Sequence, residues 1–162
     1  MKSAAAITIS GVLRKSVGGT PIPAGTLLYR ALAPLSALIL LADHPETDWQ
    51  ASGELSDWLM VNNFTAHADI VPLDSTRLAQ VNKLRARGYA LEFVIEPDPA
   101  EAGKLIKEGH SVLSFLHAQY AVPSWRPDYE QPLTPWDDLA AGVEHQARMR
   151  AHDAKTRLRI PE

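Results

Sequence analysis

Residues 4–13 read AAAITISGVL, and this stretch decides the fold of the chain. The run is apolar and rich in β-branched residues until Gly11 ends it. A continuous apolar run of this kind is typical of a strand that is covered on both faces of a parallel sheet. Residues 16–23, which are rich in glycine and proline, predict the turn that follows this strand.

Four more short apolar runs follow along the chain, and segments with helical character separate them. The predicted strands are 4–13, 37–42, 69–73, 90–95 and 112–116, and the predicted helices are 24–35, 48–61, 75–87 and 98–108. We expect Asp74 and Asp98 to cap the third and fourth of these helices. Strands that alternate with helices predict an α/β domain with a mainly parallel, Rossmann-like sheet and helices on both faces.

The length and composition limit the class of protein. The chain has 162 residues, no cysteine and a formal net charge of −3. The absence of cysteine excludes disulfides, thiolate metal sites and cysteine nucleophiles. The sequence holds no apolar run long enough for a membrane span, and the first residues do not form a signal peptide, so we expect a cytoplasmic protein.

We expect three regions along the chain. Residues 1–121 form the α/β domain, 122–133 a proline-rich connection, and 134–162 a C-terminal helix and tail. A capping pattern at 134–137 opens the last helix, which we predict to run to about residue 156. Its first half should dock on the domain through an apolar stripe, and the segment from Glu144 should project into solvent or join a partner. The predicted stripe consists of Trp136, Leu139, Ala140 and Val143.

Ligands of open parallel sheets bind beyond the carboxyl ends of the strands, where the strand order reverses. Position alone therefore selects the polar residues that directly follow each predicted strand. These candidates are Ser10, Gly11, Asp43, His44, Asp74, Glu96, Asp98 and His117.

Three segments resemble motifs of the haloacid dehalogenase (HAD) superfamily. Residues 8–13, TISGVL, resemble its first motif, in which an apolar strand ends in two acidic residues and a glycine. Residues 38–43, LILLAD, and 93–98, FVIEPD, stand where the second and fourth motifs are expected. The chain also resembles short HAD-like proteins of bacteriophages that infect actinobacteria, which would place it in the host cytoplasm. The resemblance implies a small cap-less domain over residues 4–117, with the strand order 5-4-1-2-3.

The residues that carry the superfamily's chemistry are replaced in this chain. Thr8 and Ser10 stand where the superfamily has its aspartate nucleophile and its aspartate acid–base, and Ala42 stands where a threonine or serine binds the phosphoryl group. A hydroxyl cannot match a carboxylate as a ligand of Mg²⁺, and no obvious base is at hand to activate it. We therefore predict that Thr8, Ser10 and Ala42 are degenerate forms of catalytic positions and that the chain has no catalytic residue.

The acidic residues at the sheet edge leave a binding role open. The predicted ligand-binding residues are Ser10, Gly11, Asp43, Lys83 and Glu96. Asp43, Glu96 and Asp98 could hold Mg²⁺, since hard cations take oxygen ligands; otherwise no cofactor is expected. Asp98 is equally explained as a helix cap, and Lys83 as part of a solvated helix face.

Several functions remain possible at this stage. The first is a catalytically degenerate HAD-like protein that binds a phosphate-bearing small molecule or a protein partner, or that self-associates through its C-terminal helix. The alternatives are an active Mg²⁺-dependent phosphatase or nucleotidase, and a structural or assembly protein. The basic excess after residue 143 leaves nucleic acid as a possible partner, and Trp125 and Tyr129 either strap the connection onto the domain or bind a partner.

Overall fold

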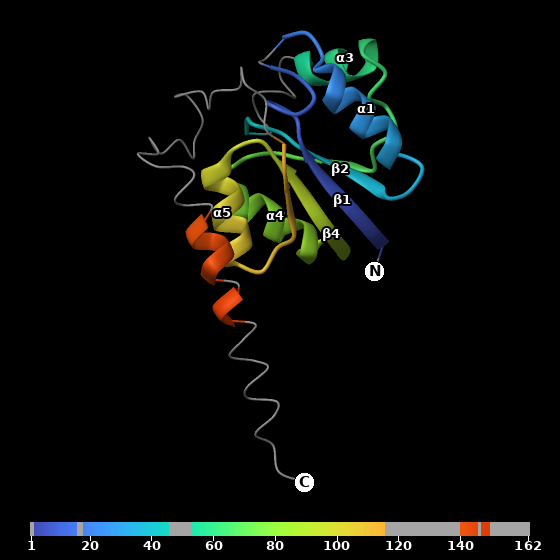
Figure 1. The fold of residues 1–162 in the computed structure, drawn as a ribbon. Coiled ribbons are helices and arrows are strands. Elements are labelled where there is room, and N and C mark those ends of the chain that lie inside the picture. The colour runs from blue at the N-terminus through green and yellow to red at the C-terminus, as the bar shows by residue number, and fades with distance from the viewer. Residues whose placement is uncertain (1, 16–17, 46–52, 116–139, 146, 150–162) are drawn as a thin grey trace, which may run out of the picture.

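The five strands lie parallel in one sheet, shown in the computed structural model of Figure 1. The model describes residues 2–15, 18–45, 53–115, 140–145 and 147–149. The strands are β1 (Lys2–Thr8), β2 (Ala37–Leu41), β3 (Asp69–Val71), β4 (Tyr89–Glu96) and β5 (Val112–Ser114). Their order is β3-β2-β1-β4-β5, with every neighbouring pair parallel. This confirms the predicted α/β fold and its strand order, with the first strand in the middle.

Helices cover both faces of the sheet. They are α1 (Pro23–Leu32), α3 (Glu54–Val61), α4 (Arg77–Ala86) and α5 (Pro99–Lys107). Figure 1 shows α1 and α3 on one face, with α4 and α5 on the other. Residues 140–145 and 147–149 are also helical, and the first of these segments lies beside α5. Among the described residues, no helix has both the length and the apolar character that a membrane crossing needs.

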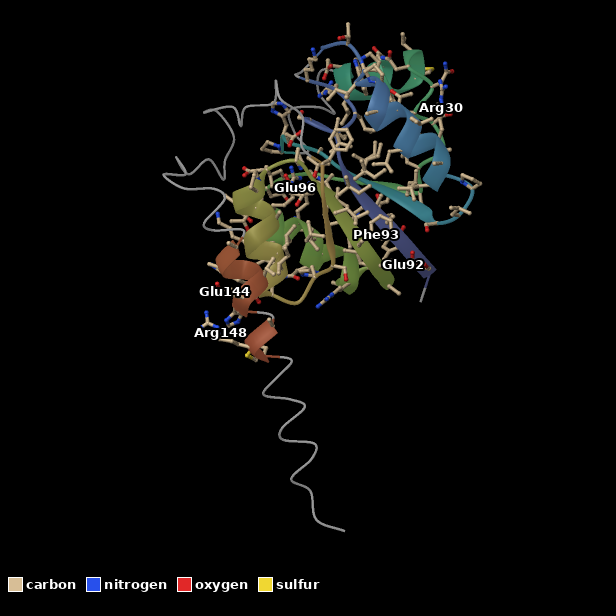
Figure 2. The ribbon with its side chains drawn as sticks, in the orientation of Figure 1. Arg30, Glu92, Phe93, Glu96, Glu144 and Arg148 are labelled. Atoms are coloured by element: carbon tan, nitrogen blue, oxygen red, sulfur yellow. The ribbon has the colours of Figure 1, made fainter. Side chains whose placement is uncertain are left out.

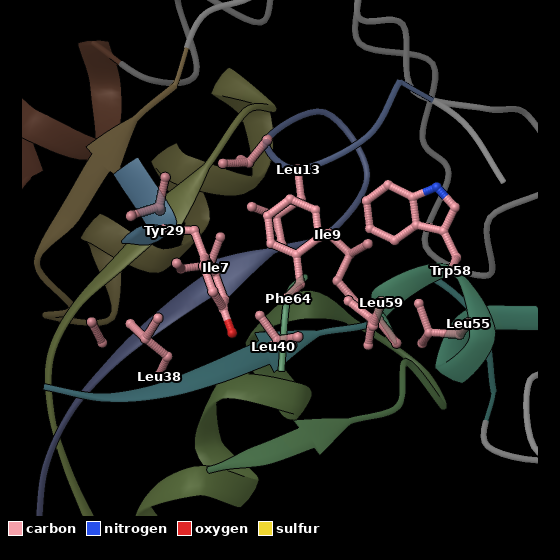
Figure 3. Packing of buried hydrophobic residues seen from close by; sticks show 14 residues of the cluster. Ile7, Ile9, Leu13, Tyr29, Leu38, Leu40, Leu55, Trp58, Leu59 and Phe64 are labelled. Atoms are coloured by element: carbon pink, nitrogen blue, oxygen red, sulfur yellow. The ribbon is translucent and has the colours of Figure 1, made fainter. Parts of the chain in front are cut away.

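The alternation of side chains along each strand produces two apolar layers. One layer, between the sheet and α4–α5, contains Ala4, Ala6, Ile39, Leu41 and Val94. The other layer lies under α1 and α3, and Figure 3 shows its side chains. In that layer the ring of Phe64 stacks on Trp58 at 5.3 Å and meets Tyr29 edge-on at 5.0 Å. Because both layers are apolar, the strand sequences read as continuous apolar runs rather than alternating ones.

The first strand ends earlier than the sequence predicts. Ile9 still donates its backbone N–H to Leu41, but its own carbonyl accepts from Leu13 and Arg14 in a turn. Gly11 lies in this turn with a φ of 90°, a conformation that favours glycine. The prediction of a strand through residue 13 was therefore wrong, because the backbone after Ile9 forms hydrogen bonds within this turn instead of with a neighbouring strand.

One of the two predicted caps is confirmed and the other is wrong. Asp98 accepts a hydrogen bond from the backbone N–H of Ala100 at 2.9 Å and caps α5. At α4 the cap is Thr76, whose hydroxyl accepts from the backbone N–H of Ala79 at 3.1 Å. Asp74 lies too early in the chain for that role and pairs with a lysine side chain instead.

Within its described residues, the C-terminal helix meets α5 through a close backbone contact at Gly142. Gly142 is buried, and a Cβ atom on it would lie 2.6 Å from the carbonyl oxygen of Gly103. Ala140 is exposed and the side chain of Val143 is 54% exposed, so the predicted docking role of these two residues was wrong. The close approach requires glycine at the contact, which periodicity does not reveal.

The other described residues of this helix are exposed to solvent. Figure 2 shows Glu144 and Arg148, an exposed ion pair at 3.4 Å, on the helix beyond α5. Trp136 and Leu139 fall outside the described residues, as do the connection 122–133 with Trp125 and Tyr129, and His117.

A substitution at Gly25 tests how α1 fits against the turn that follows β1. A Cβ atom at this position would lie 1.7 Å from the carbonyl oxygen of Val12. Alanine favours a helix over glycine by about 1 kcal/mol, yet overpacking against backbone costs about 1–3 kcal/mol or more. We therefore expect Gly25→Ala to lower the free energy of unfolding, measured by urea denaturation. The control Ala31→Gly, on the exposed side of the same helix, should cost about 1 kcal/mol, and a stabilised Gly25→Ala variant would contradict this packing.

Candidate functional site

A buried arginine occupies the carboxyl edge of the sheet. Arg77, the first residue of α4, has a fully buried side chain. Its Nη2 lies 2.8 Å from Oδ1 of Asp43, which follows β2, and its Nε lies 3.1 Å from Oε2 of Glu96, the last residue of β4. The first contact is a hydrogen-bonded ion pair, whereas the second is an ion pair without hydrogen-bond geometry. We call these three residues the arginine centre.

The remaining carboxylate oxygens of the centre are also engaged. Oδ2 of Asp43 accepts the backbone N–H of Ser10 at 3.0 Å. Oε2 of Glu96 accepts the hydroxyl of Thr8 at 2.8 Å, and Oε1 accepts the backbone N–H of Asp98 at 3.0 Å. Every oxygen of the two carboxylates therefore has a partner within the protein, as buried carboxylates require.

The other end of the guanidinium is held by Gln80, one turn further along α4. Nη1 of Arg77 donates to Oε1 of Gln80 and to the carbonyl of Ala42, the latter at 3.3 Å. The Gln80 amide donates in turn to the carbonyls of Ala42 at 2.9 Å and Val71 at 2.6 Å. These bonds fix the arginine in one orientation.

The arginine centre is closed to solvent. Two carboxylates and one guanidinium meet in its interior. The exposed fractions of Arg77, Asp43 and Glu96 are 0%, 2% and 0%. A ligand there would have to displace contacts that the protein makes with itself.

The structure brings most of the predicted edge residues together. Ser10, Asp43 and Glu96 meet at the arginine centre, and Ala42 contributes its carbonyl. Gly11 directly follows Ser10, and its N–H donates to the carbonyl of Arg14 at 2.7 Å within the turn.

Lys83 is not part of this arrangement. Its side chain is 45% exposed and pairs with Asp74. Arg77, on the same helix, carries the positive charge that was expected from Lys83, and sequence reasoning missed it. One signal was present: a cation in the first turn of a helix opposes the helix dipole, so it needs a nearby anion.

The predicted magnesium ligands do not form a cation site in this geometry. Across the part of the chain that the structure describes, no group of three or more histidine, aspartate or glutamate side chains could hold a metal ion. Asp43 and Glu96 are bound to Arg77, and the side chain of Asp98 caps α5. Binding of Mg²⁺ stays a prediction that these contacts do not favour.

A small cleft lies next to the centre, between the turn after β1 and α3. Its lining includes Arg14, Asp43, His44 and Glu54, and its volume is ≈ 10 Å³, about the space of one water molecule. Arg14 lies 2.7 Å from Glu54, and its guanidinium lies 5.2 Å from the ring centre of Trp58. As formed by the residues that the structure describes, this cleft has no room for a nucleotide or a sugar phosphate.

The sequence matches no protein-family model, and no curated protein is detectably similar to it. The resemblance to the HAD superfamily therefore rests on the three motifs alone, and the observed strand order agrees with what that resemblance implies.

Removing the arginine tests whether it neutralises the two carboxylates. We expect Arg77→Met to lower the free energy of unfolding by about 3–5 kcal/mol, because it leaves buried charge without a partner. Arg87→Met, at the end of the same helix, is the matched control, since Arg87 is 45% exposed and pairs with Asp69 at the surface. That pair should contribute about 0–1 kcal/mol.

Neutralising the carboxylates should recover part of the loss. The variant Arg77→Met/Asp43→Asn/Glu96→Gln is expected to be more stable than Arg77→Met alone when both are unfolded in urea. If Arg77→Met and Arg87→Met lower the free energy of unfolding equally, the arginine centre does not make the stabilising contribution that we expect.

Proposed function

We propose that this chain is a catalytically degenerate, HAD-like α/β protein that acts by binding a macromolecular partner. The observation that carries the proposal is the guanidinium of Arg77, which fills the space between Asp43 and Glu96. In open parallel sheets that space is where a ligand enters. Here the protein's own side chains occupy it.

The hydroxyl at the first motif position is poorly placed for nucleophilic attack. Thr8 is fully buried and donates to Glu96 at 2.8 Å, so a carboxylate base does lie beside it, contrary to the sequence expectation. If Glu96 took the proton of Thr8, however, Arg77 would lose one of its two counter-charges in the interior. Such a step costs energy, and the burial of Thr8 keeps a substrate away.

Two features favour a macromolecule over a phosphate-bearing small molecule. The protein's own side chains occupy the centre, and the described cleft beside it holds about one water molecule. In contrast, α1, α3 and the turn after α1 display several large, exposed apolar side chains, which are available for contact with a partner. The residues are Leu27, Leu35, Met60 and Val61, with exposed fractions of 72%, 77%, 62% and 78%.

An assay with p-nitrophenyl phosphate and Mg²⁺ tests the loss of chemistry. We expect no turnover above background, because the loss of a general acid–base alone costs about 10²–10⁴-fold. Inorganic phosphate and AMP should likewise leave the melting temperature unchanged. The variant Glu96→Gln should behave like the wild type in this assay. Its matched control is Glu92→Gln, which alters an exposed carboxylate on the same strand as Glu96.

The competing phosphatase function makes the opposite prediction. It requires Mg²⁺-dependent hydrolysis that disappears in Glu96→Gln and persists in Glu92→Gln, with both variants folded by circular dichroism. That result would overturn the proposal.

A further inference from the structure

A buried histidine joins the ends of two helices on the α4–α5 face. His110 follows Gly109, which ends α5 in the left-handed conformation with a φ of 87°. The backbone N–H of His110 donates to the carbonyl of Leu105 at 3.0 Å. Its side chain is 7% exposed, and Nδ1 lies 3.3 Å from Nη2 of Arg85, in the last turn of α4.

The chemistry of this contact fixes the protonation state of the imidazole. An arginine can only donate hydrogen bonds, so Nδ1 of His110 must accept and must carry no proton. The single ring proton of the neutral form is then on Nε2, a buried atom that has no hydrogen-bond partner among the described residues. A second proton would have to go on Nδ1, where it would face the Arg85 donor.

We infer that the contact between His110 and Arg85 is an acid-sensitive joint, which holds the ends of α4 and α5 together and opens when the imidazole is protonated. Protonation removes the acceptor and places two cations 3.3 Å apart. The charged groups that act on the ring are Arg85 from α4 and Glu108 from the end of α5. Glu108 is exposed and gives the smallest contribution.

The electrostatics of the site agree with this direction. Burial, followed by the charge of Arg85, lowers the pKa of His110 below its usual 6.5, and the carboxylate of Glu108 only partly opposes this. A base whose pKa is lowered by folding binds more protons in the open state. The joint is therefore stable above pH 6.5 and weakens as the pH falls from 6.5 towards the folded-state pKa.

Two measurements on the whole chain test the joint between pH 7.5 and 5. The NMR titration of the His110 ring should have a midpoint below 6.5. After correction for intrinsic rates, hydrogen exchange of the amides at residues 105–111 should accelerate by up to about tenfold for each unit of pH in this window. Hydrogen exchange of the amides of α1, on the other face of the sheet, should not accelerate in this way.

Three variants separate the joint from a general acid effect. His110→Gln keeps an acceptor for Arg85 but cannot be protonated, so its exchange at 105–111 should lose the acid acceleration. Arg85→Gln removes the second cation and should raise the midpoint of His110. The control His67→Gln removes a half-buried histidine next to the other layer and should keep the wild-type acceleration. A His110 midpoint at or above 6.5, or equal acceleration in His110→Gln, would overturn the inference.

Discussion

The buried ion pairs of Arg77 with Asp43 and Glu96 are the constraint on which the carboxyl edge of this sheet depends. An unpaired buried carboxylate costs several kcal/mol, so the loss of the guanidinium would destabilise the folded state through both acids. The three charges come from the end of β2, the end of β4 and the start of α4. The ion pairs therefore tie together elements that are distant in sequence, and the hydrogen bond from Thr8 adds the central strand β1 to the same network.

The same interaction decides what the edge can do. A divalent cation would need the carboxylates of Asp43 and Glu96, and these are the groups that Arg77 already binds. A phosphate would need free donors, and the guanidinium of Arg77 is already engaged by Asp43, Gln80 and the carbonyl of Ala42. In the proposed HAD-like protein, Thr8 and Ser10 stand where the reactive carboxylates would be, whereas Arg77 fills the space that a ligand would need. The two observations are independent, and both favour binding at another surface over phosphoryl transfer at this one.

The sequence predicted the fold well because burial on both faces leaves a direct mark, namely the uninterrupted apolar runs of the central strands. It also located Ser10, Asp43 and Glu96 at one edge, since each directly follows or ends a predicted strand. It missed Arg77 because several basic residues share α4 and their spacing does not show which one turns inward. Only the place of Arg77 in the first turn, against the helix dipole, distinguishes it from the others. The contact of Gly142 with α5 was missed for a related reason, because a glycine contact leaves no apolar periodicity.

A crystal structure of the protein grown with Mn²⁺, with its anomalous scattering recorded, tests the central claim most directly. We predict the guanidinium of Arg77 between Asp43 and Glu96, and no anomalous peak within bonding distance of either carboxylate. An Mn²⁺ ion bound to these two residues, with Arg77 displaced, would contradict the account and would return this edge of the sheet to metal-dependent chemistry.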